Sequence, residues 1–314
     1  MTQLPRSFSL SFEVNRARTQ GQAIVALEST VITHGLPAPQ NFELAADMEQ
    51  AVRDEGAIPA TVAVLDGKIH IGLGMDEVQR VASAESPRKI SLRDFATALV
   101  KDEIGGTTVA GTIFAAHQAG IQVFATGGIG GVHREKEGQA QFDISTDLQA
   151  LAQIPMIVVC AGAKSILDLD ATLEYLETLG VPVVGYGTDK FPEFFSAGEK
   201  RAVSVQLDSP QDVVKFARRH WEIGMKSAVL VCQPVPADAA MKASEAEEAE
   251  RQADDEARKK GIRGQALTPF LLKRVNELTK GKSMRANLAL LKNNATLAGK
   301  IAAQMALESH KRVI

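Results

Sequence analysis

Short apolar runs, each followed by a polar or glycine-rich turn and then a helical pattern, recur along most of this chain. The runs are Gln22–Leu27, Ile121–Ala125, Met156–Cys160, Val181–Val184 and Ala228–Cys232. Such runs are typical of strands buried on both faces, which occur mainly in parallel sheets. Strands that alternate with helices predict an α/β fold with a mainly parallel central sheet and helices on both faces.

The segments between these runs carry helix and turn signals. Asn41 is expected to cap an amphipathic helix that places Phe42 and Met48 on its apolar face. Asp66-Gly67 predicts a β-hairpin with a type I′ turn, because both residues tolerate a positive φ. Ser86–Lys89 is polar and contains a proline, which predicts a loop.

The C-terminal third is expected to form a helical cover. From Ala237 to Lys260 the chain is rich in Ala, Glu, Lys and Arg, which favours helix. Thr268-Pro269 predicts another helix start, with Thr as the N-cap and Pro at the first helical position. A last helix is expected over about Ser283–His310. Since no repeat or low-complexity linker interrupts the sequence, residues 1–314 are expected to form a single domain.

Charge and apolar patterning exclude several classes of partner. The chain has 35 basic and 38 acidic residues and only 5% aromatic residues, so it lacks the basic and aromatic surface of a nucleic-acid-binding protein. No apolar run approaches the roughly 20 residues of a membrane span, and Met1–Gln20 lacks the apolar core of a signal peptide. Cys160 and Cys232 lie inside apolar runs, as expected for thiols of a reducing compartment. We therefore expect a cytoplasmic protein without nucleic-acid or membrane partners.

Chemically useful side chains gather where strands are expected to end. Glu28 and Lys164 each follow an apolar run, and Asp189-Lys190 follows another. Ligands of open α/β sheets bind at the carboxyl ends of the strands. A carboxylate there is more often a helix cap than an acid, but burial of Glu28 would raise its pKa towards that of a general acid. His34 and His133 occur in similar glycine-containing turns.

Two further segments allow a ligand or a purely structural interpretation. Thr126–Gly131 fits neither the dinucleotide-binding nor the P-loop pattern, so it is either an anion-binding turn or a tight turn. Asp143 and Asp147 lack the Cys or His neighbours of a zinc site. One carboxylate with water molecules suits Mg²⁺ or Mn²⁺, whereas the spacing itself favours an N-cap for a helix that begins near Thr146.

Lys164 is the strongest single candidate. It follows the small-residue turn Ala161-Gly162-Ala163, where a long cation can reach a ligand. It could act as an amine nucleophile, which requires a lowered pKa, or as a phosphate clamp, which does not. A solvated side chain is the third interpretation, and the residues alone leave all three open.

Five motifs resemble those of pseudouridine-5′-phosphate glycosidases, a family that includes proteins named for indigoidine synthesis. In chain order they are Ala26–Pro37, Gly106–Thr112, Ala125–Arg134, Asp143–Leu148 and Cys160–Asp168. The similarity continues to Asn294 and covers nearly the whole chain. It implies reversible cleavage of the C–C glycosidic bond of pseudouridine 5′-phosphate to uracil and ribose 5-phosphate, with a divalent metal that is typically Mn²⁺, in a homotrimer.

The resemblance also implies roles for single residues. Lys164 matches the nucleophile that forms a ring-opened sugar adduct, Glu28 the proton donor and Asp143 the metal ligand. Asn287 matches an amide that recognises the base, and His133 belongs to the same pocket. The substrate contacts are matched by Lys89, Val109, Ser145, Thr146 and Asp147. The chain departs from the family pattern at Gln233–Pro236, where Asn-Pro-Ile-Pro is usual, so the role of residue 233 is open.

The resemblance favours the nucleophile interpretation of Lys164 for a chemical reason. A C-nucleoside has no glycosidic nitrogen, whereas an iminium at C1′ provides an electron sink for breaking a C–C bond. A two-carboxylate route through an oxocarbenium ion would leave Lys164 without a role. The alternatives are a Schiff-base aldolase or other sugar-phosphate lyase, and a non-catalytic protein that binds a sugar phosphate or nucleotide.

Overall fold

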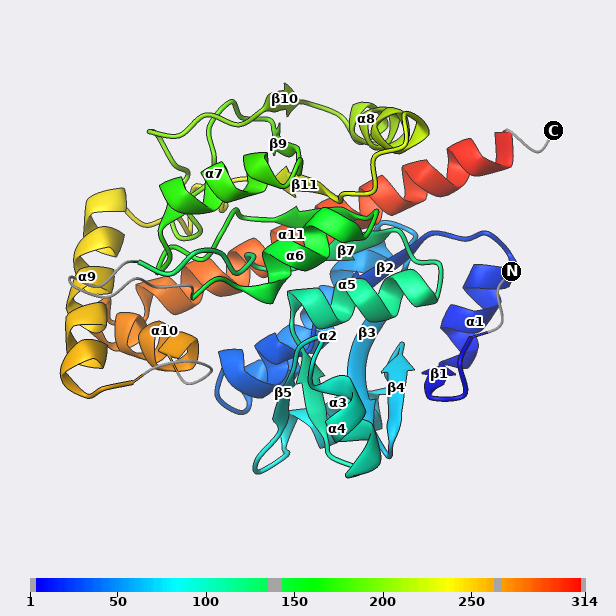
Figure 1. The fold of residues 1–314 in the computed structure, drawn as a ribbon, viewed down its shortest axis with the longest axis horizontal. Coiled ribbons are helices and arrows are strands. Elements are labelled where there is room, and N and C mark those ends of the chain that lie inside the picture. The colour runs from blue at the N-terminus through cyan, green and yellow to red at the C-terminus, as the bar shows by residue number, and fades with distance from the viewer. Residues whose placement is uncertain (1–3, 135–142, 263–266, 312–314) are drawn as a thin grey trace.

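A mainly parallel sheet runs through the structure, a computed structural model that describes residues 4–134, 143–262 and 267–311 (Figure 1). Its main path has the order β1-β4-β3-β2-β7-β8-β11-β9-β10, and β5 and β6 extend from β3. Neighbours along the path are parallel except β3–β4, and β6 is antiparallel to β3. The strands are β1 (Phe8–Leu10), β2 (Ile24–Leu27), β3 (Ile58–Leu65), β4 (Lys68–Ile71), β5 (Arg88–Ile90), β6 (Gly105–Thr107), β7 (Val123–Ala125), β8 (Ile157–Cys160), β9 (Val183–Tyr186), β10 (Val205–Leu207) and β11 (Val229–Cys232).

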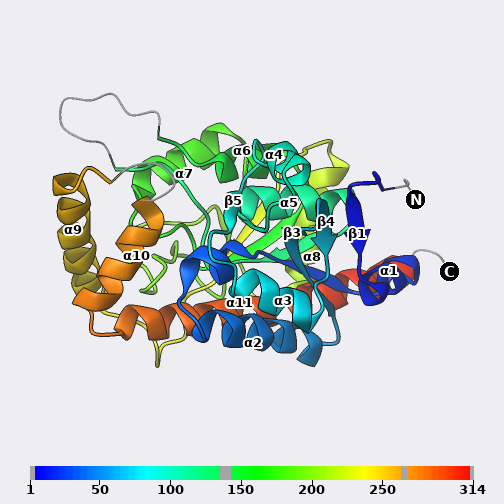
Figure 2. The same ribbon diagram turned by 90° about the horizontal axis from the view of Figure 1, so that it is seen from below.

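Helices cover both faces of the sheet, as predicted. Figure 2 shows α2 and α11 on one side and α5, α6 and α7 on the other. The helices are α1 (Phe12–Thr19), α2 (Gln40–Asp54), α3 (Met75–Ala82), α4 (Phe95–Val100), α5 (Val109–Gln118), α6 (Thr146–Gln153), α7 (Leu169–Thr178), α8 (Pro210–Glu222), α9 (Ala243–Lys259), α10 (Leu267–Leu278) and α11 (Lys282–Lys311), with a π-helical turn η1 over Val31–Gly35.

The central strands end level with one another, which sets the position of the site. Leu27 of β2 pairs with Ala125 of β7, and Ala125 pairs with Val159 of β8. Cys160 of β8 in turn pairs with Cys232 of β11. All five residues are buried. The residues that follow them therefore leave the sheet along a single edge.

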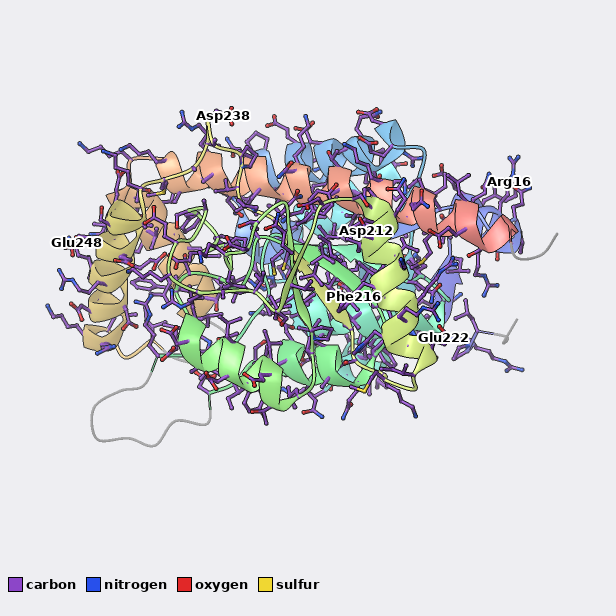
Figure 3. The ribbon with its side chains drawn as sticks, turned by 90° about the horizontal axis from the view of Figure 1, so that it is seen from above. Arg16, Asp212, Phe216, Glu222, Asp238 and Glu248 are labelled. Carbon is purple, nitrogen blue, oxygen red and sulfur yellow. The ribbon has the colours of Figure 1, made fainter. Side chains whose placement is uncertain are left out.

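The helix α11 is the longest element and crosses most of the molecule. It packs on α2 and α8 and across β2, β7 and β8. Figure 3 shows it running from the region of α9, where Glu248 lies, towards Arg16 of α1. Neither α11 nor any other helix in the described part of the chain is long and apolar enough to cross a lipid bilayer.

Most predicted elements are present, but four predictions were wrong in detail. Asn41 does not cap α2: the N-cap is Pro39, and the buried amide of Asn41 donates to the carbonyls of Ile32 and Ala82, both at 3.0 Å. Lys89 lies in a strand, because β5 pairs with the distant β6. The helix α9 begins at Ala243, not Ala237. Thr268 lies inside α10, which begins at Leu267 in the described residues.

The predicted hairpin turn is confirmed. Asp66 and Gly67 have φ values of 49° and 66°, as a type I′ turn requires.

Candidate active site

A cavity of about 370 Å³ opens at the carboxyl edge of the sheet. Residues that follow β2, β7 and β8 line it, together with side chains from α10 and α11. Every residue to which the sequence assigns a site role lies on its wall. They are Glu28, Lys89, Val109, His133, Asp143, Ser145, Thr146, Asp147, Lys164 and Asn287. By contrast, Asp189 and Lys190 pair with each other at 3.3 Å and lie outside this cavity.

Glu28 leaves β2 and turns into the cavity as a nearly buried carboxylate, 6% exposed. Both of its oxygens are engaged. The hydroxyl of Thr30 donates to Oε2, and the hydroxyl of Thr126 donates to Oε1. Burial together with two neutral donors fixes the carboxylate without pairing it to a cation, so it faces the cavity in a defined orientation.

Lys164 lies on the turn after β8, held by main-chain hydrogen bonds. Its N–H donates to the carbonyl of Ile129 at 3.0 Å, and its own carbonyl accepts from the N–H of Leu167 at 3.0 Å. Gly162 has a φ of 83°, and a Cβ there would collide with the carbonyl oxygen of Pro192. A glycine is required at this position. The turn presents Lys164, half-buried, to the same cavity as Glu28.

Lys89 brings a second amine to the cavity from β5. Burial first, and then the charge of Lys164, lower the pKa of Lys89, while Asp147 and Glu28 oppose this shift. The neighbouring His34 also has a lowered pKa, chiefly because it is buried and next because of Lys89. Lys89 and His34 therefore lose their protons more readily than the same side chains in water.

Asp147 shows what the glycine-rich turn binds within the protein. Its Oδ2 accepts from the N–H of Gly130 at 2.8 Å, and its Oδ1 accepts from the N–H of Ala110 at 2.9 Å. The second bond lies in the first turn of α5, where a carboxylate also interacts favourably with the helix dipole. Asp147 thus joins the turn to α5. The N-cap of α6 is Ser145, so the predicted helix start is right but no aspartate caps it.

Asp143 is exposed and lies at the cavity wall, where its carbonyl accepts from the N–H of His133 at 3.0 Å. Among residues 4–134, 143–262 and 267–311, no three His, Cys, Asp or Glu side chains gather into a metal-binding group. A lone accessible carboxylate fits a hard, hydrated divalent ion that keeps most of its water ligands. It does not fit a closed zinc site.

One part of the cavity wall is mainly apolar. It combines Phe194 with Leu272 of α10 and Leu291 of α11, and the half-buried Asn287 supplies an amide. This combination suits a flat ring that carries hydrogen-bonding edges.

Sequence reasoning missed several wall residues. The apolar ones carry no signal that separates them from core residues. Thr30 and Arg93 had a weak signal, since Thr30 lies within the motif around Glu28 and Arg93 is a cation four residues after Lys89.

Comparison with known proteins gives consistent matches over nearly the full length. Residues 13–304 match the family described as indigoidine synthase A like protein. A pseudouridine-5′-phosphate glycosidase of Paracoccus denitrificans is 50% identical over 305 residues, 96% of this chain and 100% of the relative. One of Geobacillus kaustophilus is 48% identical over 295 residues, 94% of this chain and 97% of the relative.

Two solved structures share the fold. The prealnumycin C-glycosynthase in complex with ribulose 5-phosphate is 38% identical, with a TM-score of 0.89 over 98% of this chain and 100% of its own. An indigoidine synthase A-like protein of Thermotoga maritima is 33% identical, with a TM-score of 0.87 over 98% and 99%.

Proposed function

The chain belongs to the indigoidine synthase A-like family, and from this membership we infer that it is a pseudouridine-5′-phosphate glycosidase. It catalyses reversible cleavage of the C–C bond between uracil and the sugar, giving uracil and ribose 5-phosphate. Curated relatives of that name share 45–50% identity with nearly the whole chain. The structural observation that carries the proposal is the placement of Glu28 and Lys164 on one cavity at the carboxyl edge of the sheet.

Lys164 serves as the nucleophile. Its neutral amine attacks C1′, the C1′–O4′ bond breaks, and the ring oxygen takes a proton from Glu28. Uracil and the lysine nitrogen are then both bonded to C1′ of an open-chain sugar. The attack leaves that nitrogen as an ammonium, which returns a proton to Glu28 and so regains its lone pair. The lone pair then forms an iminium as the C1′–C5 bond breaks, and Glu28 protonates C5 of uracil. Water hydrolyses the iminium, which releases ribose 5-phosphate and restores the amine.

Glu28 serves as the proton donor, and its surroundings suit this role. The carboxylate is almost excluded from bulk water and lines the same cavity as Lys164. Because Thr30 and Thr126 hold it by hydroxyl groups, which can donate or accept, it keeps its position in either protonation state. A single acid can therefore serve the ring oxygen and the departing carbon in turn.

A divalent cation, Mn²⁺ in the first instance, completes the proposed site, with Asp143 as its protein ligand and water as the rest of its shell. The exposed carboxylate beside the cavity fits such an ion better than it fits zinc. When bound, the ion would supply positive charge to oxygen atoms of the substrate.

The remaining wall residues bind and orient the substrate. Asn287 faces the base from the mainly apolar wall. Contacts to the sugar phosphate come from Lys89, from Val109 at the first turn of α5, and from Ser145 and Thr146. His133 lies in the same cavity. Asp147 contributes by holding the glycine-rich turn against α5, since main-chain N–H groups engage both of its oxygens.

We further propose a cytoplasmic homotrimer, on the strength of the family resemblance. Light scattering of the purified protein would then give a mass about three times the 33.6 kDa of one chain. A mass of one or two chains would contradict the trimer.

The direct test is turnover of pseudouridine 5′-phosphate, followed by the change in uracil absorbance, with Mn²⁺ or with a chelator. The proposal requires release of equimolar uracil and ribose 5-phosphate. Stabilisation by the substrate against heat without any turnover would indicate a binding protein instead. Cleavage of other sugar phosphates without uracil release would indicate an aldolase-type lyase.

A further inference from the structure

The acid Glu28 is held through a chain of buried polar groups that reaches α11 and the residue after β11. Its Oε1 accepts from the hydroxyl of Thr126, the first residue after β7. The two residues are 98 positions apart in the sequence and adjacent at the sheet edge, because β2 and β7 are paired. Thr126 is completely buried, so the position of its main chain helps to set where its hydroxyl points.

That main chain is held from two sides. The N–H of Thr126 donates to the carbonyl of Val159 at 3.0 Å. Its carbonyl accepts from Asn294, a completely buried residue near the middle of α11. The Nδ2 of Asn294 donates to the carbonyl of Thr126 at 2.8 Å, and a longer contact at 3.4 Å reaches the carbonyl of Gly127. The amide thus joins the longest helix to the turn that carries Thr126. It is the only residue of α11 with a side-chain hydrogen bond to this turn among the described residues.

Gln233 fixes the orientation of that amide. Its Nε2 donates to the Oδ1 of Asn294 at 3.1 Å and to the main-chain carbonyl of Asn293 at 2.8 Å. Its own N–H donates to the carbonyl of Cys160 at 3.0 Å, which anchors it to the end of β8. With Oδ1 accepting from Gln233, the Nδ2 of Asn294 must point at Thr126.

We propose that Gln233 and Asn294 are positioning residues for Glu28 that act through Thr126, an inference that rests on the proposed function. The order of contacts is Gln233 to Asn294, Asn294 to the carbonyl of Thr126, and the hydroxyl of Thr126 to Glu28. None of the three residues has to touch the substrate. Gln233 replaces the asparagine of the family pattern, and its extra methylene is part of the reach to α11.

The test is a double-mutant cycle on uracil release. Asn294→Ala should lower kcat about tenfold to a hundredfold, since a small displacement of a reacting group has effects of that size, while KM changes less than twofold. The slow uracil release of the Glu28→Gln variant is measured in single turnovers at high enzyme concentration. In this background, Asn294→Ala should lower the rate of uracil release less than twofold. A merely structural role would lower both rates by the same factor.

The chain offers matched controls. Asn293→Ala removes a neighbouring amide of α11, whose Nδ2 contacts Pro234 at 3.4 Å and not Thr126, and should leave kcat within twofold. Thr126→Ser keeps the hydroxyl and should retain most activity, whereas Thr126→Val should match Asn294→Ala. If Asn294→Ala does not fold, Gln233→Ala replaces it in the cycle, with Gln233→Asn expected to fall between Gln233→Ala and the wild type.

The outcomes separate the two proposals. A wild-type protein that releases no uracil contradicts the proposed function. A wild type that turns over, with an Asn294→Ala or Gln233→Ala variant equally active or equally impaired with and without Glu28, overturns the positioning role alone.

Discussion

Lys89 and Lys164 face one cavity closely enough that the charge of Lys164, after burial, lowers the pKa of Lys89. Lys89 comes from β5 and Lys164 from the turn after β8, so the sheet brings two amines together from different strands. An attacking amine must first lose its proton.

Lys164→Ala should abolish covalent capture of the sugar. We expect turnover to fall on the order of 10³-fold or more, as for other nucleophile deletions. Borohydride reduction in the presence of ribose 5-phosphate should add the mass of the open-chain sugar to the wild type and nothing to the variant. Lys190→Ala, at another strand exit but outside the cavity, is the control and should form the adduct. An adduct on the Lys164→Ala variant would reject the amine mechanism.

Glu28→Gln should separate folding from catalysis. The amide has the same shape, and its oxygen can still accept from Thr126 or Thr30, so the melting temperature should change little. It cannot donate a proton as an acid does, so kcat should fall about 10²–10⁴-fold. Glu43→Gln, an exposed change on α2, should leave kcat unchanged. Equal activity of the Glu28→Gln variant and the wild type would remove Glu28 from the mechanism.

Asp143→Asn should lower the affinity of the site for Mn²⁺. We expect the Mn²⁺ concentration for half-maximal activity to rise about tenfold or more, because even residues behind a metal ligand have effects of that size. Calorimetric titration with Mn²⁺ measures binding without turnover. Asp189→Asn, which lies outside the cavity, should leave the titration unchanged. Identical Mn²⁺ binding by the Asp143→Asn variant would exclude Asp143 as a ligand.

His34 should make the free energy of unfolding depend on pH in the acid range. Burial lowers its pKa in the folded state from 6.5, so below about pH 6.5 the unfolded chain binds the proton more readily. Stability should therefore fall as pH drops from 6.5 towards the lowered pKa, and level off below it. In urea titrations from pH 7.5 to 5, His34→Gln should reduce this slope, whereas His117→Gln, at an exposed site, should not. An unchanged slope would contradict the prediction.

Gly162→Ala should damage both stability and catalysis. A side chain at a φ of 83° costs about 1–3 kcal/mol, and the collision with Pro192 adds to this. The turn before Lys164 would have to move, so kcat should fall as well. Gly187→Ala has a similar φ of 66° but open space around it, so it should show the backbone cost alone. Denaturant titration and uracil release together distinguish the two variants.

Local sequence patterns predicted the layers of the fold and the segments that line the cavity. The apolar run before Glu28 indicated a strand end, and the small residues before Lys164 indicated a turn. Pairing between distant segments left no such local mark. The polar sequence around Lys89 becomes a strand only because β6 lies beside it. Likewise, Asn41 resembled a helix cap, but its amide serves contacts with η1 and α3.

The glycine-rich turn Thr126–Gly131 also shows that local sequence does not encode contacts with distant segments. Its composition was equally compatible with anion binding and with a tight turn. The carboxylate of Asp147, which comes from the next helix in the chain, engages the N–H of Gly130. The packing of α6 decides which acceptor binds the N–H of Gly130, and the spacing of residues within the turn does not encode it.

The geometry of α11 has one further consequence for how this protein can change. Asn287 and Asn294 are seven residues apart, which is nearly two full turns, so both amides project from one stripe of the helix. One inserted residue between them would swing the first about 100° away from the second. In the proposed site, Asn287 binds the base and Asn294 positions Glu28 through Thr126, so both functions depend on the placement of one helix. We therefore expect variants selected for a different base through a displacement of α11 to lose kcat along with their preference for uracil. Variants changed in α10 are not expected to lose kcat.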